Sequence, residues 1–229
     1  MNNKKVLAFD LSSVCIGVVA AKIENDKPTL VTSCPIIPPK FDATILGYLK
    51  SKKKIKTSPN SDKLINSYVR SGETHVSEAT KKRRDVEVRR AKDLYVLDYI
   101  GKNINDIVDA IKPDIIVVEK TEIFNGVLTS VLLAKVFGVL MGAATSRGIE
   151  VKEYKVSEVR KVFNIAKLTR EFTKDKSEED LISIPDMTKR VLRTEMERKY
   201  GHLGLKCTTD DEGDACVVFN YWCHINNIV

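Results

Sequence analysis

The chain has 229 residues, of which 43% are hydrophobic and 30% are charged, and its formal net charge is +7. This mixture is typical of a globular protein with a buried core, and it excludes a disordered chain. No apolar run approaches the roughly 18 residues that a membrane-spanning helix needs, so no membrane partner is expected. The five cysteines form no CxxC pair, which argues against a disulfide framework and predicts a reducing, cytoplasmic setting.

The N-terminal part of the chain predicts three strands joined by short turns, as in an antiparallel meander. Residues 4–10, 14–23 and 29–37 are the apolar runs that form these strands. Residues 40–80 show little periodicity and are rich in Ser, Asn and Thr, so a loop or arm is expected there. Apolar residues then recur at three- and four-residue steps over 85–111, which predicts a long helix.

The middle of the chain predicts two further strands around a helix. Residues 114–119 are a continuous β-branched run, which is typical of a central strand covered on both faces. Residues 127–146 are apolar with small side chains and predict a close-packed helix, and residues 149–154 predict a short strand. The resulting order of strands and helices predicts a mixed α/β fold around one sheet.

Helices dominate the predicted C-terminal part. One helix is expected from Ser157, residues 167–183 are expected to form a charged loop, and Pro185 is expected at the first position of a helix that ends near Tyr200. The last helix is predicted to begin after Thr209, because Glu212 three residues later completes a capping box.

Positive charge is concentrated in one segment. Residues 40–92 contain 15 Lys/Arg and 6 Asp/Glu, which leaves 23 and 25 for the rest of the chain. Basic runs are often only solvated surface, but the stretches KSKKKIK and KKRRDVEVRR fit contact with a phosphate backbone. We predict one domain over residues 1–229, with a basic insertion or arm at about 40–84. The predicted DNA contacts in this part are Lys52, Lys53, Lys54, Lys81, Lys82, Arg83 and Arg84.

Carboxylates gather where three predicted elements begin or end. Asp10 ends the first strand, Glu119 ends the central strand, and Asp211 and Asp214 lie on one face at the start of the last helix. Each alone has a simple explanation as a turn residue, an exposed strand end or a partner of the helix dipole. The four acids within 210–214 exceed what capping requires, because neighbouring carboxylates raise one another's pKa. Mg²⁺ removes such repulsion and prefers carboxylates together with phosphate oxygens, so these acids are predicted metal ligands.

The sequence resembles the RuvC-like Holliday junction resolvases of the ribonuclease H-like superfamily. The resemblance rests on FDLSSVCIGVV near the start, KPDIIVVEK in the middle and DDEGDA near the end, and it covers most of the chain outside residues 40–84. The positions that match the motifs of the family are Asp10 with Gly17, Pro113 and Asp114 with Glu119, and Asp211 with Asp214 and Ala215.

The resemblance implies a ribonuclease H-like sheet of five strands, three antiparallel and then two parallel, flanked by helices. It also implies a homodimeric endonuclease of DNA recombination and repair, dependent on Mg²⁺ or Mn²⁺, which nicks two opposing strands of a four-way DNA junction. Two ions would clamp the scissile phosphate. Asp10 would bridge them, with Glu119 on one side and Asp211 and Asp214 on the other. The dimer interface would use either the helix at 127–146 or the basic helix from Asp85.

Two further residues are candidates for roles at this site. Lys189, early in a predicted helix, would stabilise charge that develops on the phosphate, although a solvated helix residue is the simpler explanation. The family often carries an aromatic residue shortly after the strand-end Glu, which wedges into the junction. Phe124 is predicted either as this wedge or as a core residue.

Other functions remain open on the sequence alone. The same acids serve ribonuclease H-like nucleases that cut flaps, other branched DNA or RNA–DNA hybrids. A non-catalytic nucleic-acid-binding protein would need the basic arm but not the complete acid set. Residues 10–17 also resemble the first phosphate loop of an actin-like or sugar-kinase-like ATPase, but that fold needs two lobes and a second glycine-rich loop, and the sequence contains neither.

Overall fold

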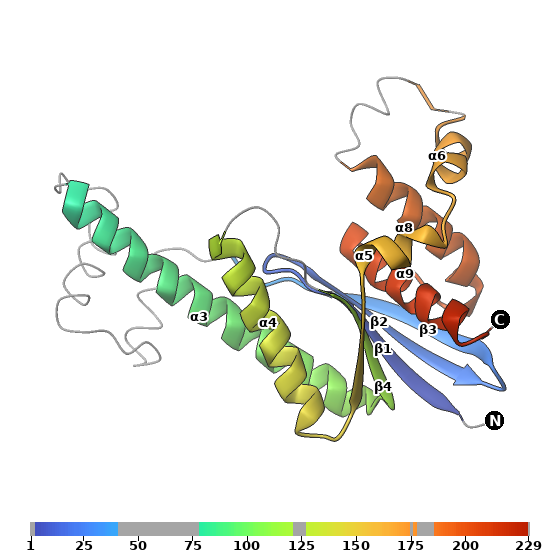
Figure 1. The fold of residues 1–229 in the computed structure, drawn as a ribbon, viewed down its shortest axis with the longest axis horizontal. Helices are drawn as coiled ribbons and strands as arrows, with labels where there is room; N and C mark the ends of the chain where they lie inside the picture. The colour runs from blue at the N-terminus through green and yellow to red at the C-terminus, as the bar shows by residue number, and fades with distance from the viewer. Residues whose placement is uncertain (1–2, 41–77, 121–126, 175, 178–185, 229) are drawn as a thin grey trace. The chain divides into compact units, whose positions relative to one another are not determined.

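The computed structural model describes residues 3–40, 78–120, 127–174, 176–177 and 186–228 (Figure 1). The chain divides into two compact units, one formed by Met1–Ile37 with Gly101–Val229 and the other by Pro38–Ile100. All five strands lie in the first unit. The organisation as one domain with an insertion at about 40–84 stays a prediction.

The first unit is built on a five-stranded sheet. Its strands are β1 (Lys4–Asp10), β2 (Ile16–Glu24), β3 (Lys27–Ile36), β4 (Ile115–Glu119) and β5 (Glu150–Tyr154). Their order in the sheet is β3-β2-β1-β4-β5. β2 pairs antiparallel with β1 and β3, whereas β4 pairs parallel with β1 and β5. The predicted sheet of three antiparallel and then two parallel strands is confirmed.

The central strands are the most deeply buried part of this sheet. Val6 to Phe9 of β1 and Ile115 to Val118 of β4 are all buried. Because both faces of these strands are covered, the continuous apolar run of β4 does not need to alternate with polar residues. Each strand ends in a carboxylate, Asp10 or Glu119, that is only partly exposed.

Two helices cover one face of the sheet, α8 (Met187–Tyr200) and α9 (Asp210–Ile225) (Figure 1). α9 packs across β1, β2, β3 and β4, and α8 packs against α9. Their buried side chains form one core cluster with the sheet, whose members include Val6, Ala8, Val19, Leu192, Met196, Phe219 and Trp222. Cys216 and Cys223 belong to the same cluster, where they pack as small apolar core residues.

The remaining long helices are α3 (Glu78–Ile111) and α4 (Val127–Thr145). α3 begins earlier than the predicted start at Asp85, because its first turns carry Lys and Arg, which favour helix without an apolar pattern. Arg147, just after α4, binds the carboxylate of Asp109 near the end of α3, with donor–acceptor distances of 2.7 and 2.8 Å. Among the described residues, no helix is both long enough and apolar enough to cross a membrane.

The predicted loop at 167–183 is wrong in its first part. After α5 (Val156–Lys161), a second short helix, α6, spans Ile165–Thr173 and packs against α8. The side chain of Asn164 caps α6 by accepting a hydrogen bond from the Lys167 amide at 3.0 Å. Its apolar residues Ile165, Leu168 and Phe172 recur at helical spacing, but none is fully buried, and the charged residues around them led to the loop prediction.

The predicted start of α8 is also wrong. Asp186 has an extended backbone and caps the helix by accepting a hydrogen bond from the Lys189 amide at 3.1 Å. The helix therefore begins at Met187, and Pro185, which lies outside the described residues, is not its first residue. An Asp cap before the first turn is the more common way to begin a helix.

Candidate metal centre

Three parallel strands bring their carboxyl ends to one edge of the sheet. In the pairing of β1 with β4, Phe9 lies opposite Val118, so the next residues, Asp10 and Glu119, end neighbouring strands. Glu119 in turn lies opposite Tyr154, the last residue of β5. The parallel register alone therefore places two of the predicted acids at the same edge.

The N-terminus of α9 carries the other two predicted acids to this edge. The Thr209 hydroxyl accepts from the Glu212 amide at 3.3 Å, and the Glu212 carboxylate accepts from the Thr209 amide at 2.8 Å. This capping box, which the sequence predicted, fixes where the helix begins. Asp211 and Asp214 follow in the first turns of α9.

Gly17 allows α9 to come this close to the sheet. It pairs with Asp10 across β1 and β2. A Cβ atom built on Gly17 would lie 1.9 Å from the Asp211 carbonyl oxygen. Any side chain at this position would therefore push the start of α9 away from Asp10.

We expect Gly17→Ala to lower the free energy of unfolding by about 3 kcal/mol, the upper range for overpacking a core. It should also weaken Mg²⁺ binding, because Asp211 moves with its backbone. Urea denaturation and titration calorimetry measure the two effects. Gly138→Ala is the matched control, since a Cβ on Gly138 of α4 meets nothing within 4 Å. Equal stability of the two variants would contradict this expectation.

Oxygen atoms of three carboxylates meet at this edge. One oxygen each from Asp10, Asp211 and Asp214 lies within 4.8 Å of the others, which is a spacing that one metal ion can bridge. Asp214 is the most buried of the three, with 6% of its surface exposed. Glu119 is not part of this set, but its charge acts on Asp10 from the neighbouring strand. All four predicted acids therefore come together electrostatically, and three of them share a potential ion.

Burial and mutual repulsion make this cluster an unfavourable place for negative charge. Burial, together with the nearby carboxylates of Asp214, Glu119 and Asp211 and against the effect of Lys189, raises the pKa of Asp10 to about 8. Burial also raises the pKa of Asp214, which Lys189 and Arg160 oppose. The cluster thus carries more negative charge than its protein surroundings neutralise.

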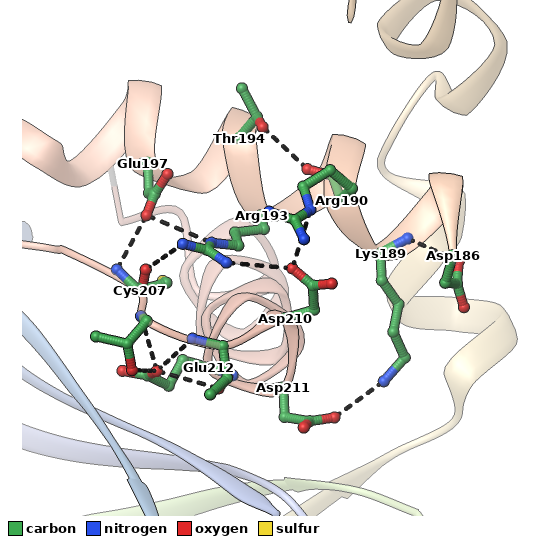
Figure 2. Close-up of polar contacts among 12 residues, drawn as sticks. Asp186, Lys189, Arg190, Arg193, Thr194, Glu197, Cys207, Asp210, Asp211 and Glu212 are labelled. Carbon is green, nitrogen blue, oxygen red and sulfur yellow. Dashed lines mark hydrogen bonds and ion pairs between the residues drawn. The ribbon is translucent and has the colours of Figure 1, made fainter. Parts of the chain in front are cut away.

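Lys189 of α8 brings a positive charge to this cluster. Its Nζ lies 3.1 Å from Asp211 Oδ1 and 2.7 Å from Asp214 Oδ2. Figure 2 shows the side chain reaching from α8 toward Asp211. The structure therefore places Lys189 inside the acid cluster, where the simpler explanation of a solvated helix residue does not apply.

A second set of ion pairs holds α8 against the start of α9 (Figure 2). Asp210 Oδ1 lies 3.4 Å from Arg190 Nε and 3.3 Å from Arg193 Nη1. Arg193 also donates to the carbonyl of Cys207. The two helices touch closely here, since a Cβ on Gly213 would lie 2.7 Å from the Arg193 Cβ.

The four acids at 210–214 therefore divide into three roles. Asp211 and Asp214 belong to the metal-binding set, Glu212 caps the helix, and Asp210 pairs with α8. This division explains how four carboxylates occupy five positions. Only Asp211 and Asp214 belong to the converging set, while Glu212 and Asp210 bind other groups.

Arg160 is a further residue of the site, and the sequence analysis missed it. It follows Val159, whose buried side chain anchors α5 in the core, and α5 packs against α9. Its charge acts on Asp214, yet among the described residues its guanidinium has no hydrogen-bond or ion-pair partner. The signal in the sequence was a basic residue six positions beyond the end of a strand predicted to be parallel, which is not specific enough to select it.

The predicted DNA contacts remain predictions. Lys52, Lys53, Lys54 and Phe124 lie outside the described residues. Lys81, Lys82, Arg83 and Arg84 lie on the helical backbone of α3, and their side chains are outside the described part.

Comparisons with known proteins find similar solved structures but no match by sequence family. No protein-family model matches the sequence, and a search of curated proteins finds no match either. Among solved structures, T. thermophilus RuvC in complex with Holliday junction substrate is similar over 96% of both chains, with 14% identity and a TM-score of 0.51. Another Thermus thermophilus RuvC structure is similar over 97% of this chain and 96% of its own, with 13% identity and a TM-score of 0.50. The chain has the RuvC-like, ribonuclease H-like fold. The RuvC-like resemblance predicted from the motifs is thereby confirmed at the level of the fold.

The family resemblance of the sequence implies a divalent metal, and the residues of this chain fit one. Three carboxylate oxygens converge at the end of the central strands, and hard ions such as Mg²⁺ prefer oxygen ligands of this kind. The pKa of Asp10 is raised in part because other carboxylates lie close to it, and a bound cation would reduce this repulsion. Asp10, Asp211 and Asp214 are thus the residues that would hold it, with Glu119 beside them.

Proposed function

We propose that the protein is a structure-specific endonuclease that requires Mg²⁺ or Mn²⁺ and resolves four-way (Holliday) DNA junctions by paired nicks. The observation that carries the proposal is the convergence of Asp10, Asp211 and Asp214 within 4.8 Å at one edge of a RuvC-like sheet. Glu119, at the end of the adjacent strand, completes the acid set. A binding protein without activity would have no use for this repulsive cluster.

Each residue of the site has a proposed task. Asp10, Glu119, Asp211 and Asp214 hold the metal, which supplies positive charge at the scissile phosphate and a nucleophilic water at neutral pH. Burial excludes bulk water from Asp214 and so strengthens its interactions with nearby charges. The Lys189 ammonium lies 2.7 Å from Asp214 Oδ2 and is suited to stabilise charge that develops on the phosphate.

Arg160 is proposed to bind a DNA phosphate beside the carboxylates. Arg160 is partly exposed, and its guanidinium carries a charge that no described carboxylate neutralises at hydrogen-bonding distance. A guanidinium in this setting matches a phosphate group in both charge and geometry. It would help a polyanion to approach a site that is itself acidic.

Arg160→Ala is expected to weaken junction binding about tenfold, since a hydrogen bond to a charged group contributes about 1.5–3 kcal/mol. The slope of log affinity against log salt should fall by about 1, the effect of one lost phosphate contact. Fluorescence anisotropy at several salt concentrations measures both. Arg198→Ala is the matched control, because Arg198 already pairs with Glu195 at 2.6 Å. An unchanged salt slope for Arg160→Ala would exclude the contact.

Paired nicks require two sites, and we propose that a second copy of the chain supplies the other. Each acid set lies within one chain, so each copy would cut one of the opposing strands. Light scattering of the purified protein, alone and with a four-way junction, tests this arrangement.

The function is tested by comparing cleavage of a four-way junction with that of a flap, an RNA–DNA hybrid and a linear duplex. The proposal expects metal-dependent, symmetric nicks in the junction and much slower cleavage of the other three. Faster cleavage of the flap or the hybrid would retain a nuclease but replace the substrate. No cleavage of any substrate with Mg²⁺ or Mn²⁺ would overturn the enzyme itself.

A further inference from the structure

The ammonium of Lys189 lies among the carboxylates that define the metal centre. Its Nζ is 2.7 Å from Asp214 Oδ2 and 3.1 Å from Asp211 Oδ1. The side chain is 31% exposed, while that of Asp214 is only 7% exposed. The capped start of α8 fixes the backbone at this residue, since the Asp186 side chain accepts from the Lys189 amide.

These two carboxylates are also two of the three that converge on one point. Asp211 and Asp214 join Asp10 in the set of oxygens within 4.8 Å. Mg²⁺ binds carboxylate oxygens at about 2.0–2.1 Å and requires a nearly ideal octahedral geometry. An ammonium that occupies the same oxygens both blocks their lone pairs and repels a second cation at short range.

We propose that Lys189 is the counter-cation of the metal-free site, so that it competes with the metal for Asp211 and Asp214 and lowers metal affinity. This inference rests on the proposed function, because it concerns the metal of that site. It also predicts that the Lys189 side chain moves when a metal binds. When a metal takes these carboxylates, the ammonium loses its partners at the place where a phosphate would arrive.

The neighbouring Arg190 provides a contrast on the same helix. Its Nε lies 3.4 Å from Asp210 Oδ1, and Asp210 is outside the converging set. Removing the charge of Arg190 therefore changes the contact between α8 and α9 without releasing a metal-binding carboxylate. The two positions separate competition for the metal from a general effect of positive charge on α8.

The test measures Mg²⁺ and Mn²⁺ dissociation constants without DNA, by calorimetry and by electron paramagnetic resonance. Lys189→Met should bind both ions about tenfold more tightly than the wild type, which corresponds to about 1.4 kcal/mol. Arg190→Met and Lys189→Arg should both keep the wild-type affinity, because each leaves a cation at position 189. Equal or weaker binding by Lys189→Met would overturn the proposal.

A second variant and a second measurement guard against misfolding. Lys189→Gln keeps a polar side chain and should also bind Mg²⁺ more tightly. In the wild type, a dimethyl label on Lys189, assigned by its loss in Lys189→Arg, should shift in the carbon spectrum when Mg²⁺ is added. A label that does not respond to saturating Mg²⁺ would contradict displacement.

The outcomes distinguish this inference from the proposed function. A wild type that cuts junctions, together with a Lys189→Met variant of unchanged Mg²⁺ affinity, would remove the inference and leave the function. A wild type that cuts nothing, with tighter binding by Lys189→Met, would remove the function and leave the inference. Failure of every variant to bind a divalent ion would overturn both.

Discussion

Asp10→Asn is expected to lower DNA cleavage at least about 100-fold, because even the outer partners of metal ligands contribute about 10–100-fold. The substitution keeps the size of the side chain and removes the carboxylate at the end of β1, which belongs to the converging set. Binding of a four-way junction should remain, since the basic residues are untouched. It should even strengthen slightly, because the site becomes less negative.

The experiment compares single-turnover cleavage with anisotropy measurements of junction affinity at saturating Mg²⁺. Asp26→Asn is the matched control, with the same chemical change at a turn residue whose φ of 60° asparagine tolerates well. Wild-type cleavage by Asp10→Asn would disprove the role assigned to Asp10. Loss of both binding and cleavage would instead indicate that the variant damages the fold.

The pattern of apolar residues predicted the sheet because each central strand carries its own signal. The run at 115–118 could only be a strand buried on both faces, and the short turns of the first 37 residues left an antiparallel meander. The capping box at Thr209 and Glu212 fixed the start of α9 to the residue. The meeting of Asp10, Glu119, Asp211 and Asp214 at one edge further depended on the parallel pairing of β1 with β4, which the resemblance implied.

Features that depend on tertiary contacts were less accessible to sequence analysis. α6 has apolar residues at helical spacing but no buried residue, and the charged residues of this segment favoured a loop; its packing against α8 is a tertiary contact. Arg160 and Asp210 are ordinary charged residues until the packing of α5 and α8 on α9 brings the charge of Arg160 near Asp214 and pairs Asp210 with Arg193. Lys189 was selected only by its place early in a helix, and its contacts with two carboxylates come from the crossing of α8 and α9.

The metal-free protein is expected to lose stability as the pH rises from about 5.5 to about 8.5. Burial, with help from Asp214, raises the pKa of Asp10 from 3.8 to about 8. Between these values the folded protein holds a proton that the unfolded chain has released, so stability falls with increasing pH. The loss over this range amounts to about 3 kcal/mol at 1.36 kcal/mol per pKa unit, as an upper limit.

Other shifted groups act outside this window or in the same direction. The pKa of Asp214 is also raised by burial, so its effect adds to that of Asp10. Although burial opposes it, hydrogen bonding lowers the pKa of Glu212, whose stabilisation is complete above about pH 5 and is lost only toward lower pH. The stabilisation from the Lys189 ion pairs is present throughout, because burial is outweighed by Asp214 and its pKa is raised.

Urea denaturation at pH 5.5 and 8.5, in the presence of a chelator, tests this expectation. Asp10→Asn should show a much smaller dependence on pH and should be more stable than the wild type at pH 8.5, although it is inactive. Mg²⁺ at 100 times its dissociation constant should stabilise the wild type at pH 8.5 by about 2.7 kcal/mol. It should act less at pH 5.5, because metal ligands must first lose their protons. A wild type that becomes more stable as the pH rises without metal would show that Asp10 is not held in a repulsive cluster, and the reason for placing a cation there would be lost.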